Sequence, residues 1–284
     1  MHYKLGLVCS MKNKHYTTNK SFRLKSLTKE KLFETVMINL EGLEKIAGYC
    51  KSNKISTLRL GNSIVPFASH PNFDQSWWNE LESLFTQTRE KLKNYPLRLT
   101  IHPGQFIQLG SKNPKVLESS LAELRYCTKV LDLLGTQKDG VICLHIGGRA
   151  GDANATIERF YEVFMQNTWL EKYLALENDE NNFNAKETLF VCKRCKIPMI
   201  FDIFHHSLNP SEIQWSEIKS SWKHKRPKIH ISSQGDGPTG MHAPYIQKKD
   251  FQTLKEFVGD DIDKIDIMIE AKAKEEAIKR VFSY

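Results

Sequence analysis

The sequence lacks several features that would assign a function directly. No GxGxxG or GxxxxGKS loop follows the first apolar run, which removes the usual evidence for a nucleotide-binding open sheet. No apolar run reaches the roughly 18 residues that a membrane span requires, and the N-terminal apolar stretch is too short for a signal peptide. We see no long-period repeat, linker or low-complexity tract. We therefore expect one domain over residues 1–284, cytoplasmic, nucleoid-associated if prokaryotic, and without a membrane partner.

The chain also lacks a cysteine framework, although it has six cysteines. Cys192 and Cys195 form a CxxC, but no second pair completes a structural zinc site. The other four are scattered, as is typical of reduced, partly buried thiols: Cys9, Cys50, Cys127 and Cys143.

The composition is that of an ordinary globular protein. Of 284 residues, 40% are hydrophobic and 26% are charged, which excludes collagen-like and disordered classes. Lys and Arg number 41 against 33 Asp and Glu, so the formal charge is 41 − 33 = +8. This excess of positive charge favours a polyanionic partner such as a nucleic acid.

Short apolar runs alternate with longer amphipathic ones along the whole chain. Several runs show no polar alternation, as expected of strands covered on both faces. The predicted strands are 4–8, 56–60, 97–101, 140–144, 173–176, 198–201, 228–231 and 265–269. The predicted helices are 28–51, 77–92, 113–134, 152–164, 185–195, 210–222, 250–258 and 271–281. Eight strands alternating with eight helices predict an α/β fold, a closed (β/α)₈ TIM barrel.

A histidine or a carboxylate stands at the carboxyl end of each of the last six predicted strands. They are His102, His145, Glu177, Asp202, His230 and Glu270. Because the carboxyl ends of barrel strands converge on one face, where active sites of this fold lie, we expect these side chains to meet.

Mixed histidine and carboxylate ligands suit Zn²⁺, Mn²⁺ or Fe²⁺. Six ligands exceed the need of one catalytic zinc, so we expect at least two ions, with Glu177 or Asp202 free to bridge them. No thiolate joins this set. His205 or His242, just beyond the strands, could hold a third ion. Two or three metals with an open site fit phosphodiester hydrolysis.

Other polar residues stand close to these strands. Lys228 precedes His230 by two residues, so both side chains point to the same side of the strand, where a lysine is costly unless paired or modified. His70 either reaches the phosphate or belongs to the loop surface. Asn178 and Asp179 could orient the ligands through hydrogen bonds.

Two features concern the substrate. Gln105 and Phe106 lie on the loop after His102, where such a pair could wedge into a base stack. Two basic segments, 10–25 and 220–228, interleave Lys and Arg with aromatic residues and suit contact with a phosphate backbone.

The motifs together resemble the UV damage endonuclease family. The matching strings run from residue 5 to residue 275 and are LGLV, FASH, HPGQF, LHIGG, LENDE, FDIFHH, KIHIS and EAKAKE. The resemblance implies a TIM barrel related to endonuclease IV with up to three divalent metals, typically manganese, although Zn²⁺ or Mg²⁺ could serve. It implies a nick immediately 5′ to cyclobutane dimers, 6-4 photoproducts and some abasic sites in double-stranded DNA, leaving a 3′-hydroxyl and a 5′-phosphate.

The resemblance also implies roles for individual residues. His102, His145 and Glu177 match one metal site. A second site, sharing Glu177, matches Glu177, Asp202, His230 and Glu270, and a third takes His205 and His242. Lys228 matches a lysine that is carboxylated in a family member. We expect catalytic roles for Glu177, Lys228 and His70.

Gln105 and Phe106 match the pair that probes the lesion. The family's pair is usually Gln-Tyr, so Phe106 lacks a hydroxyl, and Leu7 stands where a tyrosine is common. Both departures bear on lesion preference more than on cleavage.

The leading hypothesis is thus a monomeric, metal-dependent DNA repair endonuclease. A metal-dependent sugar isomerase or epimerase on the same barrel is the enzyme alternative, but a sugar needs no basic rim or aromatic wedge. A DNA-damage binding protein without cleavage activity is the third possibility, and the full ligand set argues against it.

Overall fold

The computed structural model describes residues 3–104, 106–136, 138–149 and 151–284. Within them, eight parallel strands pair in sequence order and close into a barrel, with β8 beside β1. The strands are β1 (Lys4–Val8), β2 (Thr57–Leu60), β3 (Arg98–Ile101), β4 (Val141–His145), β5 (Leu174–Glu177), β6 (Met199–Asp202), β7 (Lys228–Ile231) and β8 (Asp266–Ile269). The predicted TIM barrel is confirmed.

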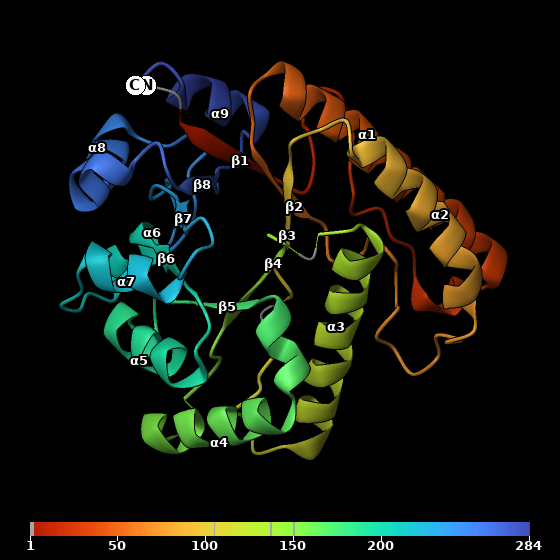
Figure 1. The fold of residues 1–284 in the computed structure, drawn as a ribbon, viewed down its shortest axis with the longest axis horizontal. Coiled ribbons are helices and arrows are strands. Elements are labelled where there is room, and N and C mark those ends of the chain that lie inside the picture. The colour runs from red at the N-terminus through yellow and green to blue at the C-terminus, as the bar shows by residue number, and fades with distance from the viewer. Residues whose placement is uncertain (1–2, 105, 137, 150) are drawn as a thin grey trace.

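Helices surround this ring of strands (Figure 1). They are α1 (Lys29–Ser52), α2 (Trp77–Leu92), α3 (Pro114–Leu133), α4 (Ala153–Gln166), α5 (Ala185–Cys195), α6 (Ile203–Leu208), α7 (Trp215–Ser221), α8 (Lys248–Val258) and α9 (Glu275–Val281). Short 3₁₀ turns cover Leu24–Ser26, Thr168–Lys172 and Gly259–Asp261.

Local sequence signals explain where several helices begin. The Thr28 side chain accepts a hydrogen bond from the Lys31 amide and starts α1. Asn113 caps α3 immediately before Pro114, whose missing N–H costs nothing at that position. Asn184 and Glu187 form a reciprocal capping box at α5.

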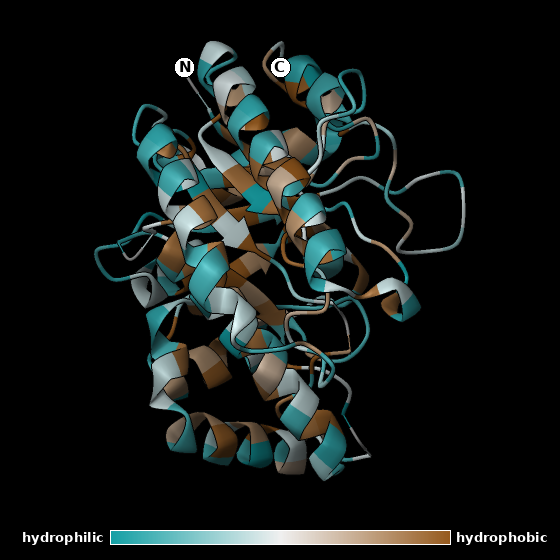
Figure 2. Ribbon diagram, turned by 90° about the vertical axis from the view of Figure 1, so that its right-hand side faces the viewer, coloured by the Kyte–Doolittle hydropathy of each residue, from teal (hydrophilic) through white to brown (hydrophobic). Residues whose placement is uncertain are grey.

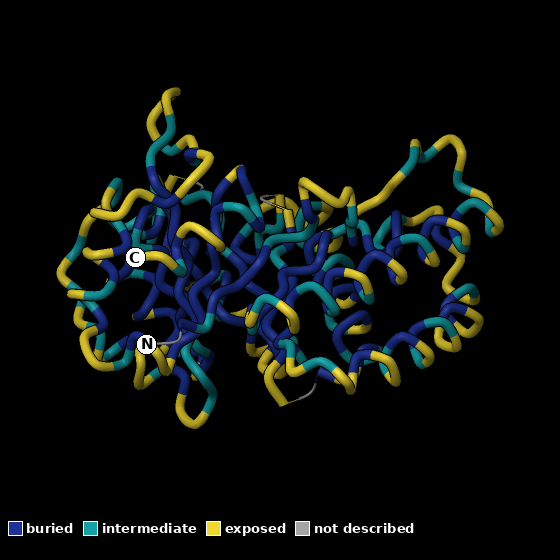
Figure 3. Tube along the Cα trace, turned by 90° about the horizontal axis from the view of Figure 1, so that it is seen from above, coloured by how far each residue is buried: buried dark blue, intermediate teal, exposed yellow. Residues whose placement is uncertain are grey.

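The strands are apolar and buried, whereas the outer faces of the helices are polar (Figures 2 and 3). A strand covered on both faces needs no polar side, which is why these strands read as continuous apolar runs. In the part of the chain that the structure describes, no helix is long and apolar enough to cross a membrane.

The structure differs from the predicted helices between β6 and β7. α6, a helix of six residues, follows β6 directly, although the sequence predicted no helix there. The predicted helix 210–222 is shortened to α7 at Trp215–Ser221. The Asp202 carboxylate caps α6, and a helix of six residues is too short for its hydrophobic periodicity to be recognised in the sequence.

The basic segment 10–25 packs against α1 at the carboxyl end of β1. Gly42 of α1 permits this approach, since a Cβ there would lie 2.0 Å from the Thr17 carbonyl oxygen. Its five cations are exposed: Lys12, Lys14, Lys20, Arg23 and Lys25. The segment begins at the carboxyl end of β1, the end at which the strand-end histidines and carboxylates lie, whereas Lys14 lies over the Tyr49 ring near the end of α1.

The second basic segment, 220–228, lies at the opposite end. It leads into the amino end of β7, and Arg226 forms an ion pair of 2.9 Å with Asp266 at the start of β8. This end lies away from the strand-end histidines and carboxylates, and contact of this segment with a phosphate backbone stays a prediction. Arg226 joins Arg98 around the buried Asp266 carboxylate, and the Arg98–Asp266 distance is 2.7 Å.

Candidate metal centre

Strand register brings the predicted ligands side by side at the carboxyl end of the barrel. His145 is the register partner of Glu177, and Asp202 is the partner of His230. His102 and Glu270 directly follow β3 and β8. Parallel strands end at one rim, so residues far apart in sequence meet there.

Glu177 lies at the middle of this cluster. Its Oε2 atom is 3.1 Å from His102 Nε2 and 3.6 Å from His145 Nε2, and its Oε1 atom is 2.6 Å from His230 Nδ1. The side chain is 1% exposed. One carboxylate thus contacts three imidazoles and has the geometry of a bridging ligand.

Three groups of side chains could each hold an ion, since the ligand atoms within each group lie within 4.8 Å of one another. They are His102 with Cys143 and Glu177, His145 with Glu177 and His205, and Glu177 with Asp202, His230 and Glu270. Glu177 belongs to all three groups. The last group has the four residues that the resemblance assigned to the second metal site.

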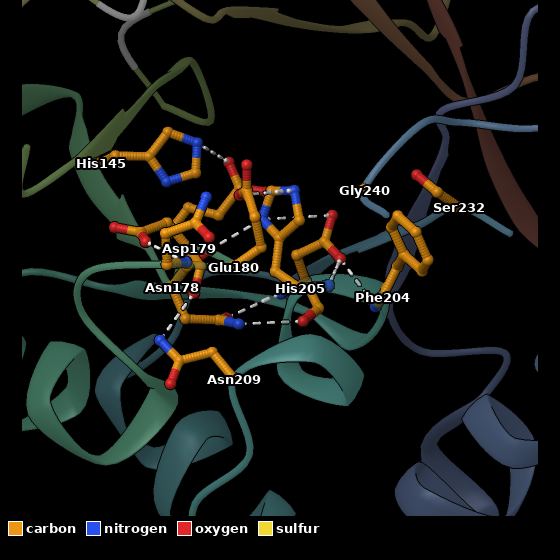
Figure 4. A network of polar contacts seen from close by, with 12 residues as sticks. His145, Asn178, Asp179, Glu180, Phe204, His205, Asn209, Ser232 and Gly240 are labelled. Carbon is orange, nitrogen blue, oxygen red and sulfur yellow. Dashed lines mark hydrogen bonds and ion pairs between the residues drawn. The ribbon is translucent and has the colours of Figure 1, made fainter. Parts of the chain in front are cut away.

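The two histidines after Asp202 point in different directions. His205 joins the cluster: its Nδ1 is 3.0 Å from the Asn178 carbonyl oxygen and its Nε2 is 3.5 Å from Glu180 (Figure 4). His206 instead packs against Phe201, with ring centroids 5.1 Å apart. Adjacent side chains of an α-helix point about 100° apart around its axis, so only one of the pair reaches the site.

His242 and His70 lie outside the three groups. Both ring nitrogens of His242 are 3.3 Å from the Ser232 hydroxyl, and its ring meets the edge of Phe204. His70 accepts a hydrogen bond from the Asn72 amide at 3.1 Å within its own loop. The third-site role of His242 and the catalytic role of His70 remain predictions.

Hydrogen bonds fix Asp202 and leave one of its oxygens unpaired. Oδ1 accepts from the amides of Phe204 and His205 at 2.7 and 2.8 Å. Asn178 donates to the Asp202 carbonyl at 3.0 Å and accepts from its amide at 2.9 Å. Oδ2 is buried without a hydrogen-bond partner. A buried carboxylate oxygen without a partner is costly, and a cation at the centre of the cluster would satisfy it.

The electrostatics of the buried carboxylates also favour a cation. Burial raises the pKa of Asp202 to about 7; the charge of His205 opposes this rise and that of Glu177 adds to it. Burial alone would raise the pKa of Glu177, but its close contacts with the imidazoles of His230, His145 and His102 hold it well below its ordinary value. Burial lowers the pKa of His230 to about 3, so this imidazole is neutral and can act as a ligand.

Arg59 is a member of the site that the sequence analysis missed. This buried residue of β2 forms an ion pair with Glu270, and its Nη2 is 3.2 Å from His230 Nε2. Burial alone would lower the pKa of Arg59, but Glu270 raises it above its ordinary value. The signal was a cation inside a buried strand, at a position whose side chain points into the barrel.

Cys143 also contacts the site, although the sequence predicted no thiolate among the ligands. Its Sγ donates a hydrogen bond of 2.8 Å to Glu177 Oε2, and the residue is buried. From the sequence alone, Cys143 was predicted to be a reduced, partly buried thiol. Only the β4–β5 pairing shows that it points inward beneath His145.

Lys228 lies inside the barrel below the ligands. It is fully buried, and its Nζ is 3.3 Å from the Thr100 hydroxyl. Burial lowers the pKa of Lys228 to about 8. Part of the amine is therefore neutral at ordinary pH, which is the form that reacts with electrophiles.

A pocket of about 550 Å³ opens above the cluster. Its lining includes Arg59, His102, Glu177 and Phe106. Phe106 is 79% exposed and lies at the rim of the pocket. Gln105, the other predicted lesion-binding residue, lies outside the described residues. An exposed aromatic side chain next to a metal ligand fits a contact surface for bases.

The profile of the family described as UV-endonuclease UvdE matches residues 4–283. A UV DNA damage endonuclease of Bacillus cereus (strain B4264) is 32% identical over 257 residues, covering 88% of this chain and 81% of the relative. One from Bacillus thuringiensis subsp. konkukian (strain 97-27) is 34% identical over 260 residues, covering 88% and 81%.

Among solved structures, the crystal structure of SacUVDE matches with a TM-score of 0.90 and 31% identity, covering 99% of each chain. A D-psicose 3-epimerase of Clostridium cellulolyticum H10 matches with a TM-score of 0.56 and 12% identity, covering 94% of this chain and 84% of that one. The latter likeness shows a shared fold alone.

Proposed function

Because the chain belongs to the UV-endonuclease UvdE family, we propose that it is a metal-dependent endonuclease that nicks DNA immediately 5′ to UV photoproducts and some abasic sites. The observation that carries the metal dependence is the position of Glu177, which is shared by three groups of possible ligands beneath an open pocket. We propose that it acts as a monomer inside the cell on double-stranded DNA.

We assign two or three divalent ions to the cluster, with Mn²⁺ as the expected metal. One ion takes His102, His145 and Glu177, and a second takes Glu177 with Asp202, His230 and Glu270. A third takes His205, with His242 as a possible second ligand. Bound there, such ions lower the pKa of a water and stabilise charge on the attacked and leaving phosphate oxygens.

The chain's own residues prepare the site for this chemistry. Asn178 holds Asp202 by two backbone hydrogen bonds, so the free carboxylate oxygen keeps its direction. Arg59 holds Glu270 by an ion pair. Lys228, neutral in part, could be carboxylated by CO₂, which would place a further anionic ligand inside the barrel. We propose that His70 reaches the phosphate when DNA is bound.

The decisive experiment uses a duplex with one defined cyclobutane dimer and a matched undamaged duplex. We expect a single nick immediately 5′ to the dimer, with a 3′-hydroxyl and a 5′-phosphate. Tight binding of the dimer without any nick would support the non-catalytic alternative. The isomerase alternative now rests on fold likeness at 12% identity alone.

Lesion recognition should depend on the rim residues Gln105 and Phe106. A damaged pair is poorly stacked, so inserting a side chain costs less there than at an intact step. Stacking is worth about 1–3 kcal/mol per base. Replacing both residues with Ala is expected to reduce discrimination between damaged and intact duplex by roughly ten- to a hundredfold, as measured by equilibrium binding.

The metal content of this double variant should not change, because neither side chain is a ligand. Phe190→Ala is the matched control, since Phe190 is an exposed aromatic residue of α5. Unchanged lesion preference with normal metal content would show that the pair only packs its loop.

DNA affinity is expected to fall steeply with salt. Segment 10–25 begins at the carboxyl end of β1, the end of the barrel that holds the predicted metal ligands, and its five cations are exposed. If about five phosphates are contacted, affinity should fall by roughly 100- to 500-fold between about 50 and 200 mM salt. Replacing Lys20 and Arg23 with Ala should reduce the slope by about two. A flat response would contradict backbone contact by this segment.

A further inference from the structure

Cys143 lies directly beneath the candidate metal centre. It precedes His145 by two residues on β4, so both side chains point into the barrel. It also packs with Val141, Ala175, Ile200 and Trp222. The thiol faces the predicted ligands, because it donates a hydrogen bond to Glu177.

Three side chains surround one carboxylate oxygen of Glu177, and His102, Cys143 and Glu177 form one of the three groups that could hold an ion. The Cys143 Sγ atom is 2.8 Å from Glu177 Oε2, and the same oxygen is 3.1 Å from His102 Nε2 and 3.6 Å from His145 Nε2. Ligands of a tetrahedral zinc, with bonds of about 2.0 to 2.3 Å, lie roughly 3.3–3.8 Å apart. The Cys143 sulfur and the Glu177 oxygen would therefore have to move apart by about 1 Å or less, from 2.8 Å, to become ligands of the same ion.

We propose that Cys143 is a thiolate ligand of an ion bound by His102 and Glu177, the two residues whose ligand atoms lie within 4.8 Å of its sulfur. The ion replaces the thiol proton, which now lies on the hydrogen bond to Glu177, and one proton leaves to solvent per ion bound. The inference rests on the metal dependence proposed above and refines it.

A thiolate changes which metal this position prefers. Sulfur ligands favour Zn²⁺ and Co²⁺, whereas carboxylates suit Mn²⁺. The group of Glu177, Asp202, His230 and Glu270 has three carboxylates and no sulfur. We therefore expect a centre with unlike ions, a thiophilic one above Cys143 and Mn²⁺ among the carboxylates.

Cobalt absorption tests this assignment on the full-length, metal-free chain. Bound Co²⁺ gives visible d–d bands with any ligands, and a thiolate adds a near-ultraviolet charge-transfer band. The wild type is expected to show both, with one thiolate per chain. Cys143→Ala and Cys143→Ser should lose the charge-transfer band and keep d–d bands, whereas the control Cys127→Ala, a buried thiol of α3, should keep both.

Competition between Zn²⁺ and Mn²⁺ provides the second readout. Removing the sulfur should weaken Zn²⁺ binding by roughly tenfold or more and change Mn²⁺ binding less. Cys143→Ser keeps a hydrogen-bond donor for Glu177, so a wild-type preference in this variant would reduce Cys143 to a positioning residue and overturn the proposal.

The outcomes separate this proposal from the metal dependence on which it rests. Wild-type d–d bands without a charge-transfer band, or a charge-transfer band that survives Cys143→Ala, would overturn the role of Cys143 alone. Failure of Co²⁺, Zn²⁺ and Mn²⁺ to bind the wild type would overturn the metal centre itself.

Discussion

Glu177→Ala is expected to reduce nicking of a dimer-containing duplex by at least about a thousandfold. Loss of a residue that only orients a ligand costs roughly 10- to 100-fold. Glu177 belongs to all three groups of possible ligands, so its removal should weaken every ion site at once. Single-turnover incision, measured together with metal stoichiometry, checks this result.

The fold should survive this substitution, because Glu177 lies at the open end of the barrel and not in its apolar layers. Circular dichroism would establish that. Glu158→Ala is the matched control, since Glu158 is an exposed carboxylate paired with Arg194 on the outer helices. Near-normal turnover of a folded Glu177→Ala protein would show that the bridging role is assigned to the wrong residue.

Asp266→Ala is expected to destabilise the protein by about 3–5 kcal/mol, which is typical when one partner of a buried ion pair is removed. The Asp266 carboxylate is fully buried at the amino end of the barrel and lies 2.7 Å from Arg98 and 2.9 Å from Arg226. Arg98 is 1% exposed and stacks over Trp222. Without Asp266 its charge would stay buried and uncompensated.

Urea unfolding measures this effect. Glu217→Ala removes an exposed ion pair with Lys193 and should lower the free energy of unfolding much less than Asp266→Ala does. A double variant with Arg98→Met and Asp266→Leu should recover much of the loss, because it removes both charges. A cost for Asp266→Ala as small as that of the surface pair would contradict the stabilising role of this cluster.

The sequence predicted the barrel because each buried strand reads as a short apolar run and each helix as a longer amphipathic one. Strand ends were also predictable, and with them the meeting of His102, Glu177 and His230. This inference needed only the rule that parallel strands end at one rim. Local sequence patterns were sufficient here because the strands of the barrel are neighbours in the same order in which they follow along the chain.

Other members of the site depended on facts that one strand does not carry. Arg59 and Cys143 lie within strands, and only the barrel's register shows that they face the ligands. The basic segment 220–228 was assigned to DNA by composition, but its place before β7 puts it at the far end. Composition shows that a segment is basic, but only the topology shows at which end of the barrel that segment lies.

Incision of the single-dimer duplex after chelation tests the central claim most directly. The protein is stripped with excess chelator, its metal content is measured by elemental analysis, and nicking is followed before and after excess Mn²⁺ is added. We predict no nicking by the stripped protein and recovery with Mn²⁺, at the position immediately 5′ to the dimer. Undiminished cleavage by protein shown to be free of metal would contradict the account.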